Sequence, residues 1–165
     1  MPAGEGRILV PTDLSDLSAG AIIQGARLAR QLKYELHVLY VVTPQEVRDI
    51  RETLGWYADE IVVRRQDEIW YQFITAVPKY LREGLRVRIE ARMGAPDEQI
   101  LKAAAQGAEL IVMATHGRGG ISHLLLGSVA ARVVREATCG VLVLNPQAIA
   151  ERAMIAQETR PRAAA

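Results

Sequence analysis

Four short and nearly continuous apolar runs divide the chain. They lie at Arg7–Pro11, Glu35–Val42, Glu109–Ala114 and Gly140–Leu144. Such runs are typical of strands buried on both faces of a parallel sheet, because helices cover both sides of that sheet. A fifth segment, Leu85–Ala91, alternates apolar and charged residues, which predicts a strand with one exposed face.

The segments between these runs repeat apolar residues at helical spacing. A helix with Ser15 or Asp16 as its N-cap is predicted from the recurrence, at i, i+3, i+4, i+7 and i+10, of Ala19, Ile22, Ile23, Ala26 and Ala29. A second helix is expected from Pro96 to Gly107, since proline suits a first turn and glycine ends a helix. A third covers Ser128–Thr138.

The connection from Pro44 to Gly84 is less regular. Residues 45–54 have a helical pattern that Gly55 interrupts, and apolar residues then recur at helical spacing up to Leu81. Pro78 would kink or shorten that helix, so we expect one long or broken helix here. The Ala- and Arg-rich tail, residues 147–165, is expected to be partly disordered, which leaves one domain over residues 1–146.

Strands that alternate with helices predict the fold class. The expected fold is a single-domain α/β protein with an open five-stranded parallel sheet and helices on both faces. In such sheets, ligands bind outside the carboxyl ends of the strands, where the strand order reverses. The residues that follow the first and fourth strands are therefore the first candidates for a site.

Composition narrows the partners and the compartment. The chain has 165 residues, 50% of them hydrophobic, and a formal net charge of +1. That charge gives no long-range attraction to nucleic acid or to an acidic membrane, so neither is an expected partner. One cysteine cannot form an intramolecular disulfide, and the sequence contains no signal-peptide or membrane-spanning pattern. We expect a cytoplasmic protein.

A glycine-rich segment follows the fourth strand, where Gly117, Gly119 and Gly120 precede Gly127 and Ser128. Glycines at a strand-to-helix turn let backbone amides approach an anion, and a helix N-terminus adds positive partial charge. The segment predicts phosphate binding. It matches neither GxxxxGK[ST] nor GxGxxG, which disfavours a P-loop hydrolase and a Rossmann dinucleotide site.

These residues resemble the universal stress protein family over about Arg7 to Asn145. The resemblance rests on Pro11-Thr12-Asp13, on Gly94 with Pro96, and above all on Ala114–Leu144, whose glycine spacing is similar to the family's G-x2-G-x9-G-[ST] motif for ATP. Ala114 stands where the motif has its first glycine, so any special backbone conformation required there would be in doubt. The resemblance implies an adenine nucleotide α-hydrolase-like, Rossmann-like three-layer sandwich.

The resemblance also implies a ligand and its contacts. ATP would lie between the first and fourth strands, with Mg²⁺ bridging its phosphate oxygens. Asp13 would bind the ribose, and Val41 would pack on adenine. Pro11 and Thr12 would shape the nucleoside pocket, and the phosphates would contact Gly117, Gly127 and Ser128, near Ala114. Arg118 either reaches the γ-phosphate or is solvated.

Each assignment has an alternative. Asp13 could cap the turn into the first helix, and Ser128 could be an N-cap without any ligand. Phosphoryl transfer needs positioned cations, metal-holding carboxylates and a group that orients the nucleophile, and only Arg118 is in place, so no catalytic residue is assigned. The leading hypothesis is an ATP-dependent stress-response or signalling module. A slow ATPase or self-phosphorylating protein, with Ser128 or Thr115 as acceptor, and a dimeric interaction protein without nucleotide remain alternatives.

A homodimer is the expected assembly, with an unidentified protein as a further partner. The last strand, Val141–Leu144, is apolar and is expected at a sheet edge, where unpaired backbone groups accept another strand. The resemblance implies a dimer formed by that strand.

Overall fold

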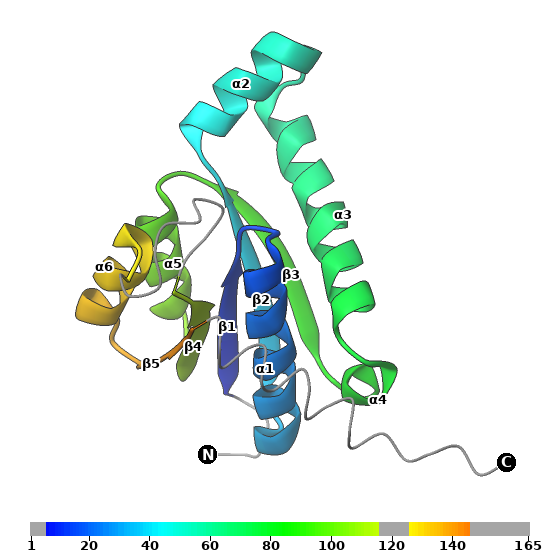
Figure 1. Cartoon of the computed structure of the whole chain (residues 1–165), viewed down its shortest axis with the longest axis vertical. Coiled ribbons are helices and arrows are strands. Elements are labelled where there is room, and N and C mark those ends of the chain that lie inside the picture. The colour runs from blue at the N-terminus through cyan, green and yellow to red at the C-terminus, as the bar shows by residue number, and fades with distance from the viewer. Residues whose placement is uncertain (1–5, 116–125, 146–165) are drawn as a thin grey trace, which may run out of the picture.

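A computed structural model describes residues 6–115 and 126–145 of the chain, so the tail at 147–165 lies outside the described residues. Five parallel strands form one open sheet in the order β3-β2-β1-β4-β5 (Figure 1). The strands are β1 (Arg7–Thr12), β2 (Glu35–Val42), β3 (Val87–Met93), β4 (Leu110–Ala114) and β5 (Gly140–Leu144). The predicted fold class is therefore confirmed, although β3 begins two residues later than its alternating pattern indicated.

Helices cover both faces of the sheet, which gives the three layers visible in Figure 1. Helices α1 (Asp16–Leu32) and α3 (Ala58–Ala76) cover one face, and α5 (Pro96–Ala104) and α6 (Ser128–Glu136) cover the other. Each interface has its own hydrophobic core, centred on residues such as Val10 and Ile22 on the first face and on Leu9 and Ile111 on the second. Alternate residues of β1 thus enter different cores, as the geometry of a strand requires.

Helix α1 is fixed at both ends and lies close to the sheet. Ser15 is its N-cap and accepts a hydrogen bond from the backbone N–H of Ser18, and Lys33 ends it in the left-handed conformation, with φ of 59°. Gly25 faces β1 so closely that a Cβ atom there would lie 2.5 Å from Cγ2 of Val10. Close packing on β1 therefore requires glycine at this position.

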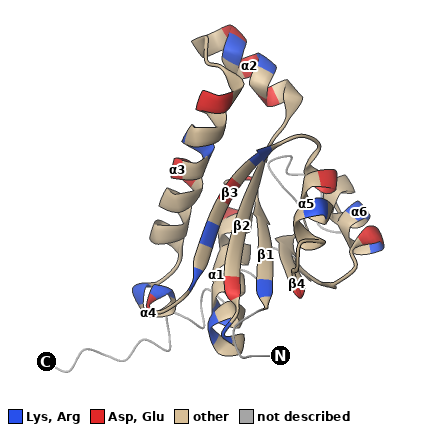
Figure 2. Ribbon diagram, turned by 180° about the vertical axis from the view of Figure 1, so that it is seen from behind, with Lys and Arg blue, Asp and Glu red and all other residues tan. Residues whose placement is uncertain are grey.

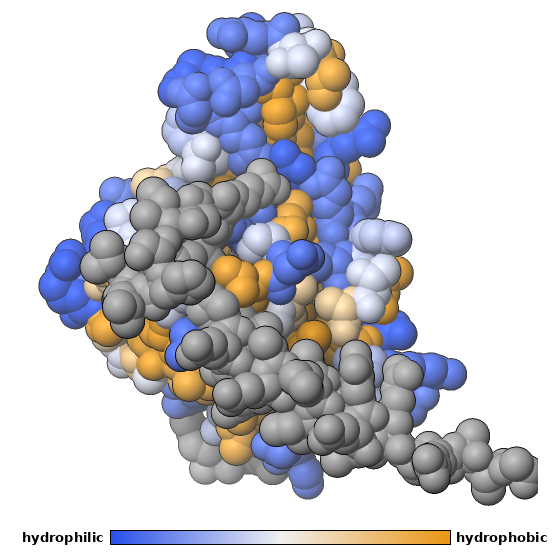
Figure 3. All heavy atoms as spheres, viewed as in Figure 1, coloured by the Kyte–Doolittle hydropathy of each residue, from blue (hydrophilic) through white to orange (hydrophobic). Residues whose placement is uncertain are grey.

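Residues 44–84 form three helices, as the broken-helix expectation anticipated. Helix α2 (Pro44–Leu54) ends at Gly55, which has φ of 72°, and α3 ends before Pro78, after which α4 (Lys79–Arg82) forms a single turn. Helix α2 and the first half of α3 extend past the carboxyl edge of the sheet as a hairpin (Figure 1). The surface of its tip is mainly hydrophilic (Figure 3), and α2 has no fully buried residue.

The sheet has two edges, β3 and β5, as the strand order shows. One face of β3 carries Arg88, Glu90 and Arg92, which appear as charged bands in Figure 2. Charged side chains on an edge strand disfavour uncontrolled pairing with other strands. None of the helices in the described ranges combines the length and apolar composition needed to cross a lipid bilayer.

Candidate functional site

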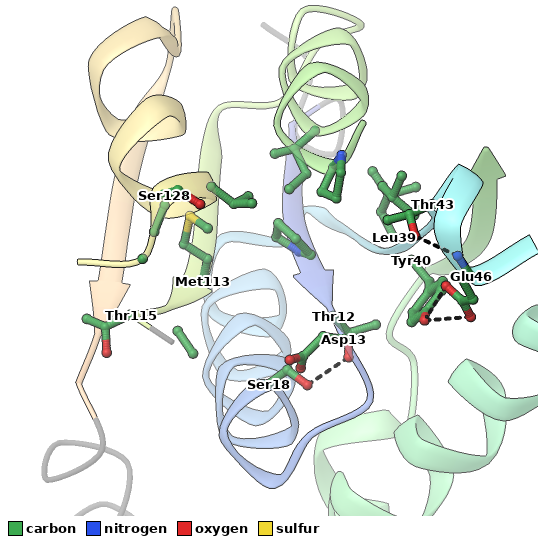
Figure 4. A pocket seen from close by; sticks show the side chains of 18 residues that line it. Thr12, Asp13, Ser18, Leu39, Tyr40, Thr43, Glu46, Met113, Thr115 and Ser128 are labelled. Carbon is green, nitrogen blue, oxygen red and sulfur yellow. Dashed lines mark hydrogen bonds between the residues drawn. The ribbon is translucent and has the colours of Figure 1, made fainter. Parts of the chain in front are cut away.

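A cavity of about 390 Å³ opens at the carboxyl ends of β1 and β4. The chain runs from β1 to β2 and β3 on one side and then crosses to β4 on the other, so this is where the strand order reverses. The cavity volume is within the range of small-ligand sites. Its walls come from the ends of β1, β2 and β4 and the beginnings of α2, α5 and α6 (Figure 4).

The structure brings most of the predicted binding residues together around this cavity. Those that line it are Pro11, Thr12, Asp13, Val41, Ala114, Gly127 and Ser128. Gly117 and Arg118 lie outside the described residues. Apolar side chains that the sequence analysis did not single out complete the walls, namely Leu39, Ile100 and Met113. The cavity therefore has an apolar interior between two polar ends.

Within the part of the chain that the structure describes, Asp13 uses only one of its two carboxylate oxygens. Oδ1 accepts hydrogen bonds from the backbone N–H of Ser15 at 3.1 Å and from its hydroxyl at 2.5 Å. Oδ2 is buried and has no hydrogen-bond partner among the described residues. Asp13 therefore does cap the turn into the first helix, as the alternative interpretation expected, but only through Oδ1. Because a buried unpaired oxygen is unfavourable, Oδ2 is available for a ligand donor in the cavity.

The loop that carries Asp13 is held by a side chain from α3. The hydroxyl of Thr12 donates to Oε1 of Gln72 at 2.8 Å, and Nε2 of Gln72 donates to the carbonyl of Ser15 at 3.1 Å. The Thr12 oxygen also lies 2.9 Å from Oγ of Ser18 and accepts from the N–H of Leu14. The sequence analysis missed Gln72, since no local pattern marks a contact across 60 residues.

The beginning of α6 forms the opposite polar end of the cavity. Gly127 is the N-cap, so Ser128 is the first helical residue and not the cap that the alternative interpretation required. The N–H of Gly127 donates to the carbonyl of Thr115 at 3.0 Å, and a Cβ atom at this glycine would lie 3.1 Å from that oxygen. The close approach of α6 to the end of β4 therefore favours glycine.

Ala114 is compatible with its place in the cavity wall. The non-glycine residues with positive φ in the described ranges are Leu14 and Lys33, so Ala114 has no left-handed backbone that a Cβ would strain. By contrast, Gly94 has φ of 140°, which side-chain-bearing residues rarely adopt. The departure of Ala114 from the glycine motif therefore introduces no conformational penalty.

A charged cluster forms the wall at the end of β2. The hydroxyl of Tyr40 donates to the carboxylate of Glu46, 3.0 Å from each oxygen, and Nε of Arg65 donates to Oε1 of Glu46 at 2.7 Å. The guanidinium of Arg65 also lies over the Tyr40 ring, 5.4 Å from its centroid. Helices α2 and α3 are thereby joined to β2 by residues that the sequence analysis did not identify.

No group of three or more His, Cys, Asp or Glu side chains in the described residues is arranged to hold a metal ion. The two carboxylates that line the cavity have different partners. Asp13 accepts hydrogen bonds from Ser15, and Glu46 accepts them from Tyr40 and Arg65. A divalent cation at this site would therefore need ligands from a bound anion.

A second polar cluster lies in the sheet away from the cavity. His37 is fully buried in β2, and its Nε2 lies 2.8 Å from Oε2 of Glu90. Burial, with the nearby Arg88 and Arg7, lowers the pKa of His37 to about 4, against the opposing effect of Glu90. Burial alone would raise the pKa of Glu90, but hydrogen bonds from Arg92 and the charge of Arg88 lower it. This cluster therefore joins a buried histidine to Glu90, whose carboxylate is paired with Arg88 and Arg92.

Three comparisons with known proteins agree. The model of the universal stress protein family matches residues 5–145. Universal stress protein MJ0531 of Methanocaldococcus jannaschii is 33% identical over 141 residues, which cover 84% of this chain and 81% of the relative. The structure of universal stress protein UspA from Lactobacillus plantarum is similar with a TM-score of 0.65 and 26% identity, covering 86% of this chain and 99% of that one. A universal stress protein solved in complex with cAMP has a TM-score of 0.57 at 24% identity, covering 84% and 96%.

Proposed function

Because the chain belongs to the universal stress protein family, we propose that it binds ATP in the cavity between β1 and β4. In this proposal the protein is a nucleotide-dependent module of a stress response or of signalling. The observation that carries the proposal is the unpaired, buried Oδ2 of Asp13 at the cavity. A ribose hydroxyl is a donor of suitable size and would satisfy that oxygen.

The remaining walls fit the other parts of a nucleotide. Val41, with Leu39 and Met113, offers an apolar surface for the flat face of adenine. Across the cavity, the first turn of α6 has backbone N–H groups without intrahelical partners, as every helix N-terminus has. The N–H of Gly127 is paired with the Thr115 carbonyl, so the groups offered to the phosphates in this proposal are those of Ser128 and Val129. Mg²⁺ in this proposal is held by phosphate oxygens and water.

The proposed assembly is a homodimer that pairs through β5. This strand lies at the sheet edge, and its residues Val141, Leu142 and Val143 are only partly buried in the single chain. Unpaired backbone groups on an apolar edge strand favour pairing with a second strand. Light scattering at micromolar concentration tests this, and a monomer would contradict it.

The binding test begins with freshly purified protein, which is denatured so that any released nucleotide can be identified by chromatography and mass. The protein is then titrated calorimetrically with ATP and magnesium, with cAMP and GTP as comparison ligands. We expect saturable binding of ATP. Absence of binding at millimolar ATP would contradict the proposal.

A variant pair tests where ATP binds. Gly127→Val places a branched side chain against the Thr115 carbonyl, so we expect it to lower ATP affinity about 100-fold, or about 3 kcal/mol. Ala131→Val adds the same side chain to α6 at a position that does not line the cavity, and should retain affinity. Equal affinities of the two variants would place the ligand elsewhere.

A further inference from the structure

We propose that Gln72 is a positioning residue for Asp13, so that ribose binding depends on helix α3. The inference rests on the proposed nucleotide function and adds a residue to it. Gln72 does not line the cavity and would not touch the ligand. It acts through the loop that connects β1 to α1.

Gln72 contacts this loop on both sides of Asp13. Its Oε1 accepts from the hydroxyl of Thr12, the residue before Asp13, and its Nε2 donates to the carbonyl of Ser15, two residues after it. One planar amide therefore fixes the distance between the two ends of the Asp13 turn. Thr12 in turn accepts from the N–H of Leu14, so the restraint reaches the residue next to Asp13.

The loop needs such a restraint because its backbone is strained. Leu14 has φ of 65°, a left-handed conformation that is unfavourable for a residue with a branched side chain. Such conformations persist only where surrounding contacts hold them. The hydrogen bonds of Gln72 and Thr12 supply contacts of this kind, and they orient the Asp13 carboxylate at the same time.

Helix α3 is attached to the site wall at a second point. Arg65, two turns before Gln72 on the same helix, pairs with Glu46, which accepts from the hydroxyl of Tyr40 on β2. The two attachments hold the ends of the neighbouring strands β1 and β2, where Thr12 and Tyr40 line the cavity (Figure 4). A displacement of α3 would therefore move the Asp13 loop relative to β2.

The first test compares two methionine variants. Methionine is close to glutamine in length and cannot make the amide hydrogen bonds. We expect Gln72→Met to lower ATP affinity about tenfold, the effect of losing roughly one hydrogen bond's contribution to positioning. Gln66→Met, on the same helix and also half-buried, is the matched control and should bind as the wild type does.

The loss should be specific to the ribose hydroxyls. Wild-type protein is expected to bind ATP more tightly than 2′,3′-dideoxy-ATP, and Gln72→Met should lose most of that preference. Hydrogen exchange without nucleotide gives a readout that does not depend on binding. The amides of Leu14 and Ser15 should exchange faster in Gln72→Met than in Gln66→Met.

A third variant tests the hydrogen bonds directly. Gln72→Glu keeps an acceptor for Thr12, but its ionised form cannot donate to the Ser15 carbonyl. Once protonated, the carboxyl again has both a donor and an acceptor. The ordinary pKa of a glutamate carboxyl is about 4.3, so the affinity of Gln72→Glu relative to wild type should recover as the pH is lowered from about 6 to about 4.

The outcomes separate this inference from the proposed function. If wild-type protein does not bind ATP, the proposed function fails, whatever the exchange data show. If wild type binds and Gln72→Met keeps its ribose preference and its loop protection, the positioning role is overturned. Two further results overturn the positioning role. One is an equal loss of ATP affinity in Gln72→Met and Gln66→Met, and the other is a ratio of Gln72→Glu affinity to wild-type affinity that does not change with pH.

Discussion

Several buried polar atoms have no hydrogen-bond partner among the described residues, and two of them, in Asp13 and His37, have different surroundings. Oδ2 of Asp13 lies at the end of β1, where a cavity opens. Nδ1 of His37 lies in the middle of the β-sheet, in a side chain that is not exposed at all. Asp13 lines that cavity, so a bound ligand would lie beside its side chain, whereas His37 is fully buried within the sheet.

The comparison teaches that an unpaired polar atom is a binding signal only where space adjoins it. At His37 the unpaired nitrogen is accommodated by a shift in protonation, since its pKa falls to about 4. At Asp13 the second oxygen can be satisfied from outside the chain. The first atom should therefore affect ligand affinity, and the second should affect stability.

The largest expected effect follows from removing the charge of Asp13. Asp13→Asn keeps the shape of the side chain but turns a charged acceptor into a neutral amide. We expect ATP affinity to fall by about 2 to 3 kcal/mol, or about 30- to 150-fold, as measured by calorimetry. Asp16→Asn, three residues further on and exposed, is the control. Similar affinities for the two variants would remove the distinction between the two unpaired atoms.

The second effect concerns His37 and the pH dependence of stability. In the unfolded chain its imidazole has a pKa near the ordinary value of 6.5, and in the folded protein the pKa is about 4. Between these values the unfolded state binds the proton first, so acid favours unfolding. We expect the free energy of unfolding to fall by about 2 kcal/mol from pH 7 to pH 5, as urea titrations would measure.

A variant isolates this contribution. His37→Gln removes the titrating group, so most of the loss between pH 7 and pH 5 should disappear. Carboxylates titrate mainly below that window, which keeps the effect of Glu90 apart. If the free energy of unfolding of His37→Gln falls as steeply between pH 7 and pH 5 as that of the wild type, other groups dominate the response to acid.

The smallest effect is expected where a polar group near the cavity has a partner inside the protein. Tyr40→Phe removes one hydrogen bond to Glu46 and leaves the contact of Glu46 with Arg65 in place. We expect a loss of about 1 kcal/mol in stability and less than about threefold in ATP affinity. If Tyr40→Phe lowered ATP affinity more than Asp13→Asn does, the unpaired oxygen of Asp13 would not be the more important group for binding.

Much of the fold was predictable because its signals are local. The apolar runs of β1, β2, β4 and β5 and the start signals of α1 and α5 depend on neighbouring residues alone, and they match the structure closely. Helix α5 ends at Ala104, before the glycine at which its end was predicted. The start of β3 was predicted two residues too early, since a half-exposed edge strand is held by pairing with β2 and not by its own sequence alone.

The site was predictable only in part, for the same physical reason. Asp13 and Gly127 lie in turns beside strands, where residue type and position are informative. Gln72 and Arg65 lie in a helix of ordinary composition, and their roles arise from tertiary contacts with residues far away in the sequence. Such contacts become visible only when α3 is packed against the sheet.

The hydrogen bonds around Thr115 connect two properties that are usually measured separately. Its carbonyl accepts from Gly127 at the start of α6, and its N–H donates to the carbonyl of Leu144 at the end of β5. The end of the cavity at α6 is thus joined through a single residue to the outermost strand. A ligand that orders this turn would therefore also affect the strand through which a second copy would attach. Ligand affinity is best measured at several protein concentrations, and self-association at several degrees of ligand saturation.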